Sequence, residues 1–188
     1  DMMAEVAATL AFSTIANNDK VGVIFFSDKV EKFIPAQKGK THVLHIIREL
    51  LSFEPSSSGT DIAQALQYFA NAQKRHCTAF LISDFIGSGT MYKPLLIASN
   101  RHELNAIQIY DRREAELPNV GLVKFHDAET GGDLWVDTSI AAVRNEYAKT
   151  WNDNQNELQQ LFTRTGVNNI SIRTDEDYVK ALMHLFRC

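Results

Sequence analysis

The strongest indication of the fold is the segment Cys77-Thr78-Ala79-Phe80-Leu81-Ile82-Ser83-Asp84-Phe85. It is an apolar run of strand length that ends in a carboxylate. A second oxygen-bearing loop, Ser58-Gly59-Thr60-Asp61, lies about one helix upstream. Parallel strands in open α/β sheets present ligand-binding groups at their carboxyl ends, so we predict that Thr60 and Asp84 share one edge of the sheet. A hydroxyl and a carboxylate form half of a site for a hard cation.

Helical and strand patterns alternate along the rest of the chain, which predicts a parallel sheet covered on both faces. Helical spacing predicts helices over residues 2–17, 41–51, 62–74, 92–100 and 141–165, and a last helix running to residue 186. Continuous apolar runs predict strands over 21–26, 77–82, 104–110 and 169–172. The alternating segment 29–36 contains Pro35, which fits only an edge strand. Residues 120–137 alternate around a Gly-rich turn and predict a β-hairpin excursion from a single domain spanning 1–188.

Side chains with short polar groups mark the expected helix starts. Thr41 is predicted to cap the second helix, and either Thr60 or Asp61 the third. Thr138 or Ser139 is predicted to cap the long helix, which should end before Gly166. Thr174 and Asp177 have a spacing like that of a capping box before the last helix.

Composition excludes several classes of protein. The chain of 188 residues is 45% hydrophobic, which suits one substantial core. A formal net charge of −4 argues against a general nucleic-acid binder. No apolar run reaches the length of a membrane span, so we expect no membrane contact by this segment. The cysteines Cys77 and Cys188 suit a reducing compartment, and the predicted location is cytoplasmic.

The ordered set of motifs resembles the von Willebrand factor A fold and, more narrowly, the bacterial family called domain of unknown function 58. The motifs that carry this resemblance are the segment 17–28, Ser58-Gly59-Thr60-Asp61, Leu81-Ile82-Ser83-Asp84-Phe85, the segment 110–118, Val136-Asp137-Thr138-Ser139 and the segment 174–179. It covers essentially the whole chain. The resemblance implies a Rossmann-like, three-layer sandwich with a mostly parallel sheet.

Proteins of this fold commonly carry a metal-ion-dependent adhesion site. The resemblance implies that Thr60 and Asp84 are ligands of Mg²⁺ or another divalent cation in the intact protein, with none bound by these 188 residues alone. The family's Asp-x-Ser-x-Ser loop is absent from this sequence and is expected upstream of Asp1. Asp28, Ser58, Asp61 and Ser83 could orient the ligands.

Each candidate also has an ordinary structural role. Thr60 and Asp61 could cap a helix, and Asp84 could accept backbone amides in its loop. Asp28 could belong to a turn. These alternatives stay open on the sequence alone.

The resemblance implies a non-enzymatic interaction domain that uses a cation to grip an acidic side chain on a partner, associated with a MoxR-type AAA+ ATPase or its client. The loop at residues 87–90 would form the rim of the site. A second hypothesis is a metal-free scaffold that binds partners through the hairpin and the long helix. A third is a hydrolase with Asp84 as a metal-bound base, for which the sequence offers no nucleophile.

The family's first strand normally lies in the middle of the sheet, and this sequence opens inside a helix. We therefore expect unpaired strand edges on both sides of a gap. An upstream segment could fill the gap, the neighbouring strands could close up, or chains could self-associate through it.

Other chemically active residues carry weaker signals. His42 and His45 have one-turn spacing but no third ligand in reach, and His76 beside Cys77 marks an ordinary strand entry. The segment 111–114 could be a partner surface or a self-paired loop. Trp135 and Trp151 could be packing residues or interface anchors.

Overall fold

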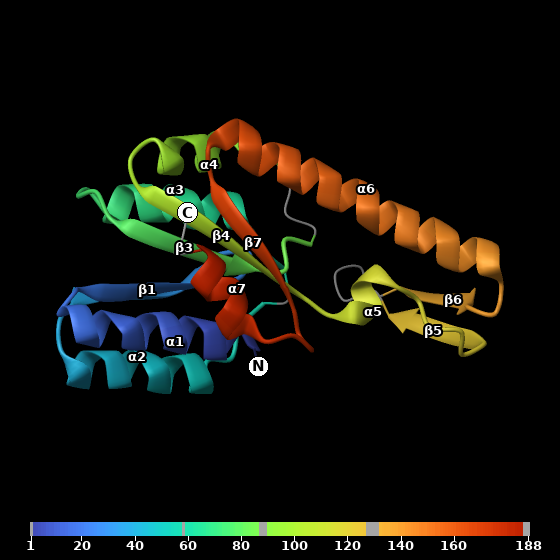
Figure 1. Cartoon of the computed structure of the whole chain (residues 1–188), viewed down its shortest axis with the longest axis horizontal. Helices are drawn as coiled ribbons and strands as arrows, with labels where there is room; N and C mark the ends of the chain where they lie inside the picture. The colour runs from blue at the N-terminus through green and yellow to red at the C-terminus, as the bar shows by residue number, and fades with distance from the viewer. Residues whose placement is uncertain (1, 58, 87–89, 127–131, 186–188) are drawn as a thin grey trace.

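The computed structural model describes residues 2–57, 59–86, 90–126 and 132–185 (Figure 1). In chain order the elements are α1 (Met2–Asn17), β1 (Val21–Phe26), β2 (Val30–Gln37), α2 (Lys40–Ser52), α3 (Ile62–Ala72), β3 (Thr78–Ser83), α4 (Tyr92–Ser99), β4 (Glu103–Tyr110), α5 (Arg112–Ala115), β5 (Leu122–His126), β6 (Asp133–Asp137), α6 (Ala141–Thr165), β7 (Asn168–Arg173) and α7 (Tyr178–Leu185). The predicted order is confirmed, and α5 is the one short helix among these that the sequence patterns did not indicate.

A parallel sheet of order β3-β4-β7 forms the centre of the molecule. Its register places Ile82 beside Ile107, and Ile107 beside Ile170. The middle strand, β4, is buried along nearly its whole length, as its apolar run predicts. Buried polar groups on β4 are satisfied locally, since Gln108 donates to the Asp84 carbonyl at 3.2 Å and accepts from Ser171 at 2.8 Å.

Strands β1 and β2 form a separate antiparallel pair. Pro35 lies on β2, whose neighbour among the described residues is β1, so the predicted edge position is confirmed. A bulge near Gly22 brings β2 so close that an added Cβ would lie 2.8 Å from the Ala36 nitrogen. The expected gap lies between β1 and β3, which are not neighbours in either sheet, so the parallel part is the three-stranded sheet β3-β4-β7 and β1 pairs with the antiparallel β2.

Helices cover both faces of these sheets, which gives three layers (Figure 1). On one face α3, α4 and the end of α6 pack on β3 and β4 through Leu66, Leu95 and Phe162. On the other face α1 and α7 pack on β4 and β7 through Val6, Leu182 and Ile172. Helices α1 and α2 close over β1 and β2 through a third cluster.

The predicted caps are confirmed at some helices and wrong at others. Asp61, not Thr60, caps α3 by accepting from the Gln64 amide at 2.9 Å. Helix α2 begins after Gly39, with Thr41 inside its first turn, and Thr41 is not its cap. Helix α6 begins after Ile140 without a side-chain cap, so Thr138 and Ser139 are not caps either.

The end of β7 is tied back to β4 by side chains in place of the expected capping box. Thr174 donates to Asp111 at 3.1 Å. Asp177 accepts from the Val179 amide at 3.1 Å at the start of α7.

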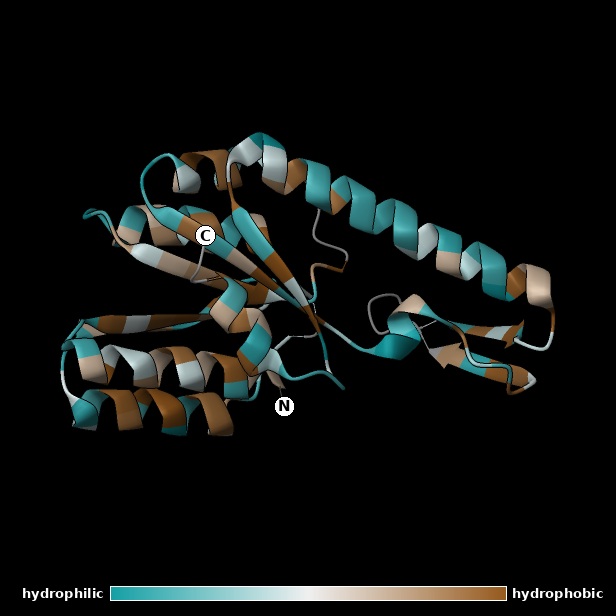
Figure 2. Cartoon of the chain, in the orientation of Figure 1, coloured by the Kyte–Doolittle hydropathy of each residue, from teal (hydrophilic) through white to brown (hydrophobic). Residues whose placement is uncertain are grey.

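The predicted hairpin of residues 120–137 is confirmed as β5 and β6, and its turn at 127–131 lies outside the described residues. Thr138 closes the base of this hairpin: its buried hydroxyl donates to the Gly121 carbonyl at 2.8 Å and accepts from the Val120 amide at 3.0 Å. The largely polar α6 runs from the hairpin to the parallel sheet (Figure 2). Within the described ranges, no helix combines the length and apolar character that crossing a bilayer requires.

Candidate functional site

Asp84 directly follows β3, at the carboxyl edge of the parallel sheet. One of its carboxylate oxygens, Oδ1, accepts from the Ser83 hydroxyl at 3.3 Å and from the Ile86 amide at 3.1 Å. The buried Ser83 hydroxyl also accepts from the Phe85 amide at 3.1 Å. The Ser83 hydroxyl and the Ile86 amide therefore hold one oxygen of Asp84 in place, as both the ligand role and the loop role predict.

Thr60 reaches the same edge from the loop before α3. The next residue, Asp61, donates its amide to the Ser27 carbonyl at the end of β1, at 2.8 Å. The Asp61 side chain caps α3, so the predicted cap is confirmed for Asp61 and is wrong for Thr60. Thr60 is partly buried. The Thr60 hydroxyl is left without a hydrogen bond to the other described residues.

Asp28 and Ser27 form a neighbouring network at the end of β1. The Ser27 hydroxyl is 3.1 Å from Asp28 and 2.7 Å from Glu31. Glu31 in turn accepts from the amide and hydroxyl of Ser56, which fastens the loop before α3 to β2. These hydrogen bonds from Ser27 and Ser56 lower the pKa of Glu31. Asp28 itself is exposed in a turn, with Gly59 packed against it, and Ser58 lies outside the described residues.

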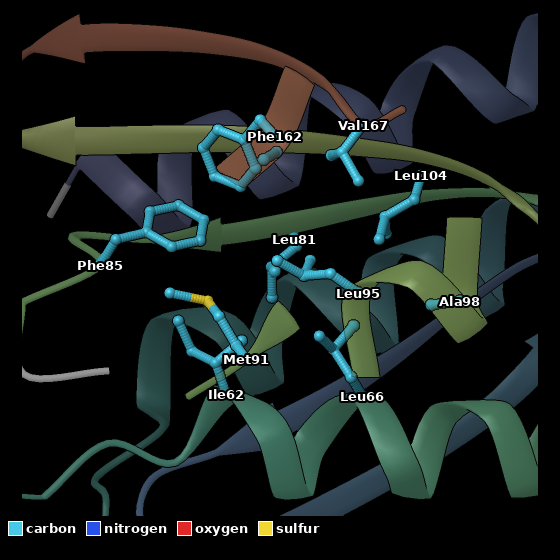
Figure 3. Packing of buried hydrophobic residues seen from close by; sticks show 11 residues of the cluster. Ile62, Leu66, Leu81, Phe85, Met91, Leu95, Ala98, Leu104, Phe162 and Val167 are labelled. Atoms are coloured by element: carbon cyan, nitrogen blue, oxygen red, sulfur yellow. The ribbon is translucent and has the colours of Figure 1, made fainter. Parts of the chain in front are cut away.

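One apolar cluster brings these loops together. Ile62, at the start of α3, packs with Phe85 and Met91, which follow β3 (Figure 3). Phe26 at the end of β1 packs against the same cluster. The carboxyl ends of β1 and β3 therefore lie at one edge. This arrangement supports the prediction that Thr60 and Asp84 face the same region.

Phe85 holds an unusual backbone conformation beside Asp84. Its φ is 59°, in the left-handed region that bulky L-residues rarely adopt. Its buried ring meets Phe162 edge-on, with ring centroids 5.4 Å apart (Figure 3). Burial of the ring therefore fixes the turn that orients Asp84.

Glu114 is a neighbour of this edge that sequence reasoning did not assign to it. Its Oε2 is buried and makes no hydrogen bond within the described part of the chain. Burial raises the pKa of the Glu114 carboxyl, and the nearby carboxylates of Asp84 and Asp111 raise it further, although a backbone hydrogen bond at Asp111 lowers it. The sequence could have indicated Glu114 by its position, because it is a carboxylate on the connection that follows a parallel strand. The rest of this segment is self-paired, with Arg112 and Glu116 3.4 Å apart.

The described residues fit a divalent cation only in part. Thr60 and one oxygen of Asp84 supply hard oxygen donors of the kind that Mg²⁺ prefers. Among the residues that the structure describes, however, no cluster of three or more His, Cys, Asp or Glu is placed to hold a metal. The expected rim at 87–90 lies outside the described residues except for Thr90.

Comparison with known proteins identifies the family. The sequence profile of a family described as "Protein of unknown function DUF58" matches residues 1–157. The chain belongs to this family. An uncharacterized protein of Mycobacterium tuberculosis strain H37Rv, Rv1480, is 27% identical over 183 residues, which are 95% of this DUF58 chain and 57% of that protein. An uncharacterized Mycobacterium avium protein, MAV169, is 28% identical over 158 residues, which are 82% of the chain and 92% of that protein.

Solved structures support the DUF58 fold. BatB from Bacteroides thetaiotaomicron, a conserved hypothetical protein, matches with a TM-score of 0.57 and 17% identity over 98% of this chain and 86% of that one. An aerotolerance-related membrane protein from Bacteroides fragilis matches with a TM-score of 0.57 and 19% identity over 98% of this chain and 89% of that one. The two TM-scores show a shared α/β fold.

Most of the remaining candidates of the DUF58 chain have structural roles. His42 is 2.9 Å from the Val21 carbonyl, and His45 is 3.8 Å from Glu49, so they are a helix pair without a metal cluster among the described residues. Trp151 stacks on Tyr110 with centroids 5.2 Å apart. Trp135 is instead 61% exposed on the hairpin, as an interface anchor would be.

His76 and Cys77 at the entry to β3 belong to a small cluster around His102. The Cys77 sulfur is 3.6 Å from Nδ1 of the buried His102. Burial raises the pKa of Cys77 and lowers that of His102, so both groups are held neutral.

Proposed function

We propose that this chain is the main part of a non-enzymatic protein-interaction domain that holds a divalent cation at the Asp84 edge in the intact protein. The proposal is supported by the loop that carries Thr60: the adjacent Asp61 bonds to the end of β1, and Ile62 packs with Phe85, the residue after Asp84. Thr60 and Asp84 would hold the cation, which would offer an open coordination position to an acidic side chain of a partner. A cytoplasmic location and the absence of enzymatic activity belong to the same proposal.

A MoxR-type AAA+ ATPase, or its client, is the proposed partner, on the strength of the family resemblance. The chain spans 57% of the length of its relative Rv1480. The family resemblance implies that the remaining ligands belong to an Asp-x-Ser-x-Ser loop, which is absent from these residues. The buried carboxyl of Glu114 lies beside this edge, and the Asp84 carboxylate contributes to raising its pKa.

The test is capture of the purified AAA+ ATPase of the same organism by the natural full-length protein. We expect capture in Mg²⁺, loss of capture with a chelator, and loss with Asp84→Ala. Asp153→Ala is the matched control, because Asp153 is an exposed carboxylate on α6. Capture that is equal with and without Asp84 would contradict the proposal.

A second candidate function is supported by the hairpin. Large apolar side chains are strongly exposed on it: Val120 at 65%, Leu122 at 64%, Leu134 at 65% and Trp135 at 61%. Such a group is typical of an interaction surface (Figure 2). Capture that survives the chelator and Asp84→Ala but fails with Trp135→Ser would favour a metal-free scaffold over the cation-dependent domain.

A further inference from the structure

The loop before α3 is fastened to strands β1 and β2 at two points, one on each side of Thr60. Ahead of Thr60, the Ser56 amide donates to Oε1 of Glu31 on β2 at 3.0 Å. The Ser56 hydroxyl donates to the same carboxylate, 2.7 Å from Oε1 and 2.8 Å from Oε2. Directly after Thr60, the Asp61 amide donates to the Ser27 carbonyl at 2.8 Å. Two fixed points therefore enclose the short stretch that carries Thr60.

Both fixed points lead to Ser27, which is buried at the end of β1. The Ser27 carbonyl accepts from Asp61, and its hydroxyl donates to Glu31 at 2.7 Å. Asp28 is a weaker acceptor for the single proton of this hydroxyl, at 3.1 Å. The Glu31 carboxylate is therefore the link that attaches Ser56 to the residue that also holds the other end of the loop.

The Glu31 side chain suits this link better than a ligand role of its own. Both of its oxygens accept from Ser56, and Oε1 also accepts from Ser27. The hydrogen bonds from Ser27 and Ser56 lower the pKa of the Glu31 carboxyl, so it stays ionised at neutral pH. Hydrogen bonds to an ionised acceptor are stronger than those between neutral groups.

We propose that Glu31 is a positioning residue for the cation: through Ser56 and Ser27 it fixes the loop so that Thr60 is held at the Asp84 edge before the cation binds. A ligand that is held in advance loses less conformational entropy on binding, which raises the affinity. The inference rests on the proposed function, because it requires a cation bound by Thr60 and Asp84.

Isothermal titration calorimetry of the natural full-length protein with MgCl₂ measures the effect. Glu31→Ala should bind Mg²⁺ about tenfold more weakly than the wild type, because the loop is released at one of its two fixed points. Glu31→Gln should stay within about twofold of the wild type, since its amide oxygen can replace Oε1, which accepts from both Ser27 and the Ser56 amide. Glu157→Ala, at an exposed glutamate on α6, is the matched control and should bind like the wild type.

The outcomes separate this inference from the proposed function. If Glu31→Gln bound as weakly as Glu31→Ala, the charge of Glu31 and not its hydrogen bonds would support binding, and the proposal would be overturned. Equal affinity of Glu31→Ala and the wild type would also overturn it, while weaker binding by Asp84→Ala in the same series would leave the proposed function standing. Absence of Mg²⁺ binding by the wild type would overturn the proposed function and this inference with it.

Residue-resolved NMR hydrogen exchange gives a second measurement that needs no cation. In Glu31→Ala the Asp61 amide should exchange at least about tenfold faster than in the wild type, while the Ile86 amide should be unchanged. Ser56→Ala removes one donor at an exposed position and should shift exchange and affinity in the same direction, even if Glu31→Ala is too unstable to titrate. Unchanged exchange of the Asp61 amide in both variants would overturn the proposal.

Discussion

Phe85 shows how a single residue can link the core to the proposed site. Its left-handed backbone costs about 1 kcal/mol or more for a residue with a side chain, while its buried ring offsets that cost by packing on Phe162. The turn that carries Asp84 thus depends on an apolar contact beneath it.

Substitutions at Phe85 should separate ring burial from backbone strain. Phe85→Ala should lower the free energy of unfolding by about 3–5 kcal/mol. Phe85→Gly should be as stable as Phe85→Ala or up to about 1 kcal/mol more stable, because glycine adopts this φ without penalty. Urea unfolding of the natural protein measures both. Ala148→Gly on α6 is the control and should show the usual loss of about 1 kcal/mol. If Phe85→Ala were clearly more stable than Phe85→Gly, the backbone at this position would not be strained as inferred.

The Glu114 carboxyl should make stability depend on pH. Its pKa is raised in the folded protein, so the folded state binds its proton more tightly than the unfolded state does. This contribution is favourable at low pH and is lost as the pH rises from the ordinary glutamate value through the raised one. Glu114→Gln should therefore raise the melting temperature at pH 8 and leave it nearly unchanged at pH 4. A melting temperature that falls at pH 8 would show instead that the ionised carboxylate is stabilising.

The sequence anticipated the site residues unevenly. Asp61 could be named as a possible cap because its partner, Gln64, lies within the same turn. Glu114 could not be placed near Asp84, because the fold alone brings these two connections together. Local chemistry is readable from spacing, while contacts between distant loops are not.

Among the helices and strands, helix ends were predicted where the signal is local and missed where a distant contact decides them. The C-terminus of α6 was predicted from Gly166, whose φ of 67° favours glycine. This signal is local, because it depends on the residue at that position and not on a distant contact. The start of α6 was not predicted correctly, because the Thr138 hydroxyl donates to the Gly121 carbonyl at the base of the hairpin and does not cap the helix. A residue type that often caps helices therefore does not do so where a tertiary hydrogen bond already occupies its polar group.

Gly166 gives the clearest test at this scale. Gly166→Ala should lower the free energy of unfolding by about 1 kcal/mol, because alanine is strained in the left-handed conformation. Gly166→Asn should cost less, since asparagine tolerates this region better. Thermal and urea unfolding measure the difference. Equal stability of the alanine variant and the wild type would mean that the helix ends differently in solution.

For the whole molecule, alternation of helices and strands was enough to predict a covered parallel sheet, and β3, β4 and β7 form one. The gap between β1 and β3 was predicted from the family resemblance, because strand order is not encoded in any local pattern. Of the outcomes expected for the gap, closure of the neighbouring strands is wrong for the described residues, because a groove lies between them.

The proposed function depends on binding of a divalent cation at the Asp84 edge of the intact protein. Isothermal titration calorimetry of the natural full-length protein with MgCl₂ measures this binding. We expect saturable binding by the wild type and by Asp153→Ala, and binding at least about tenfold weaker by Asp84→Ala, because a charged oxygen ligand is lost. Equal Mg²⁺ affinity of Asp84→Ala and the wild type would contradict it.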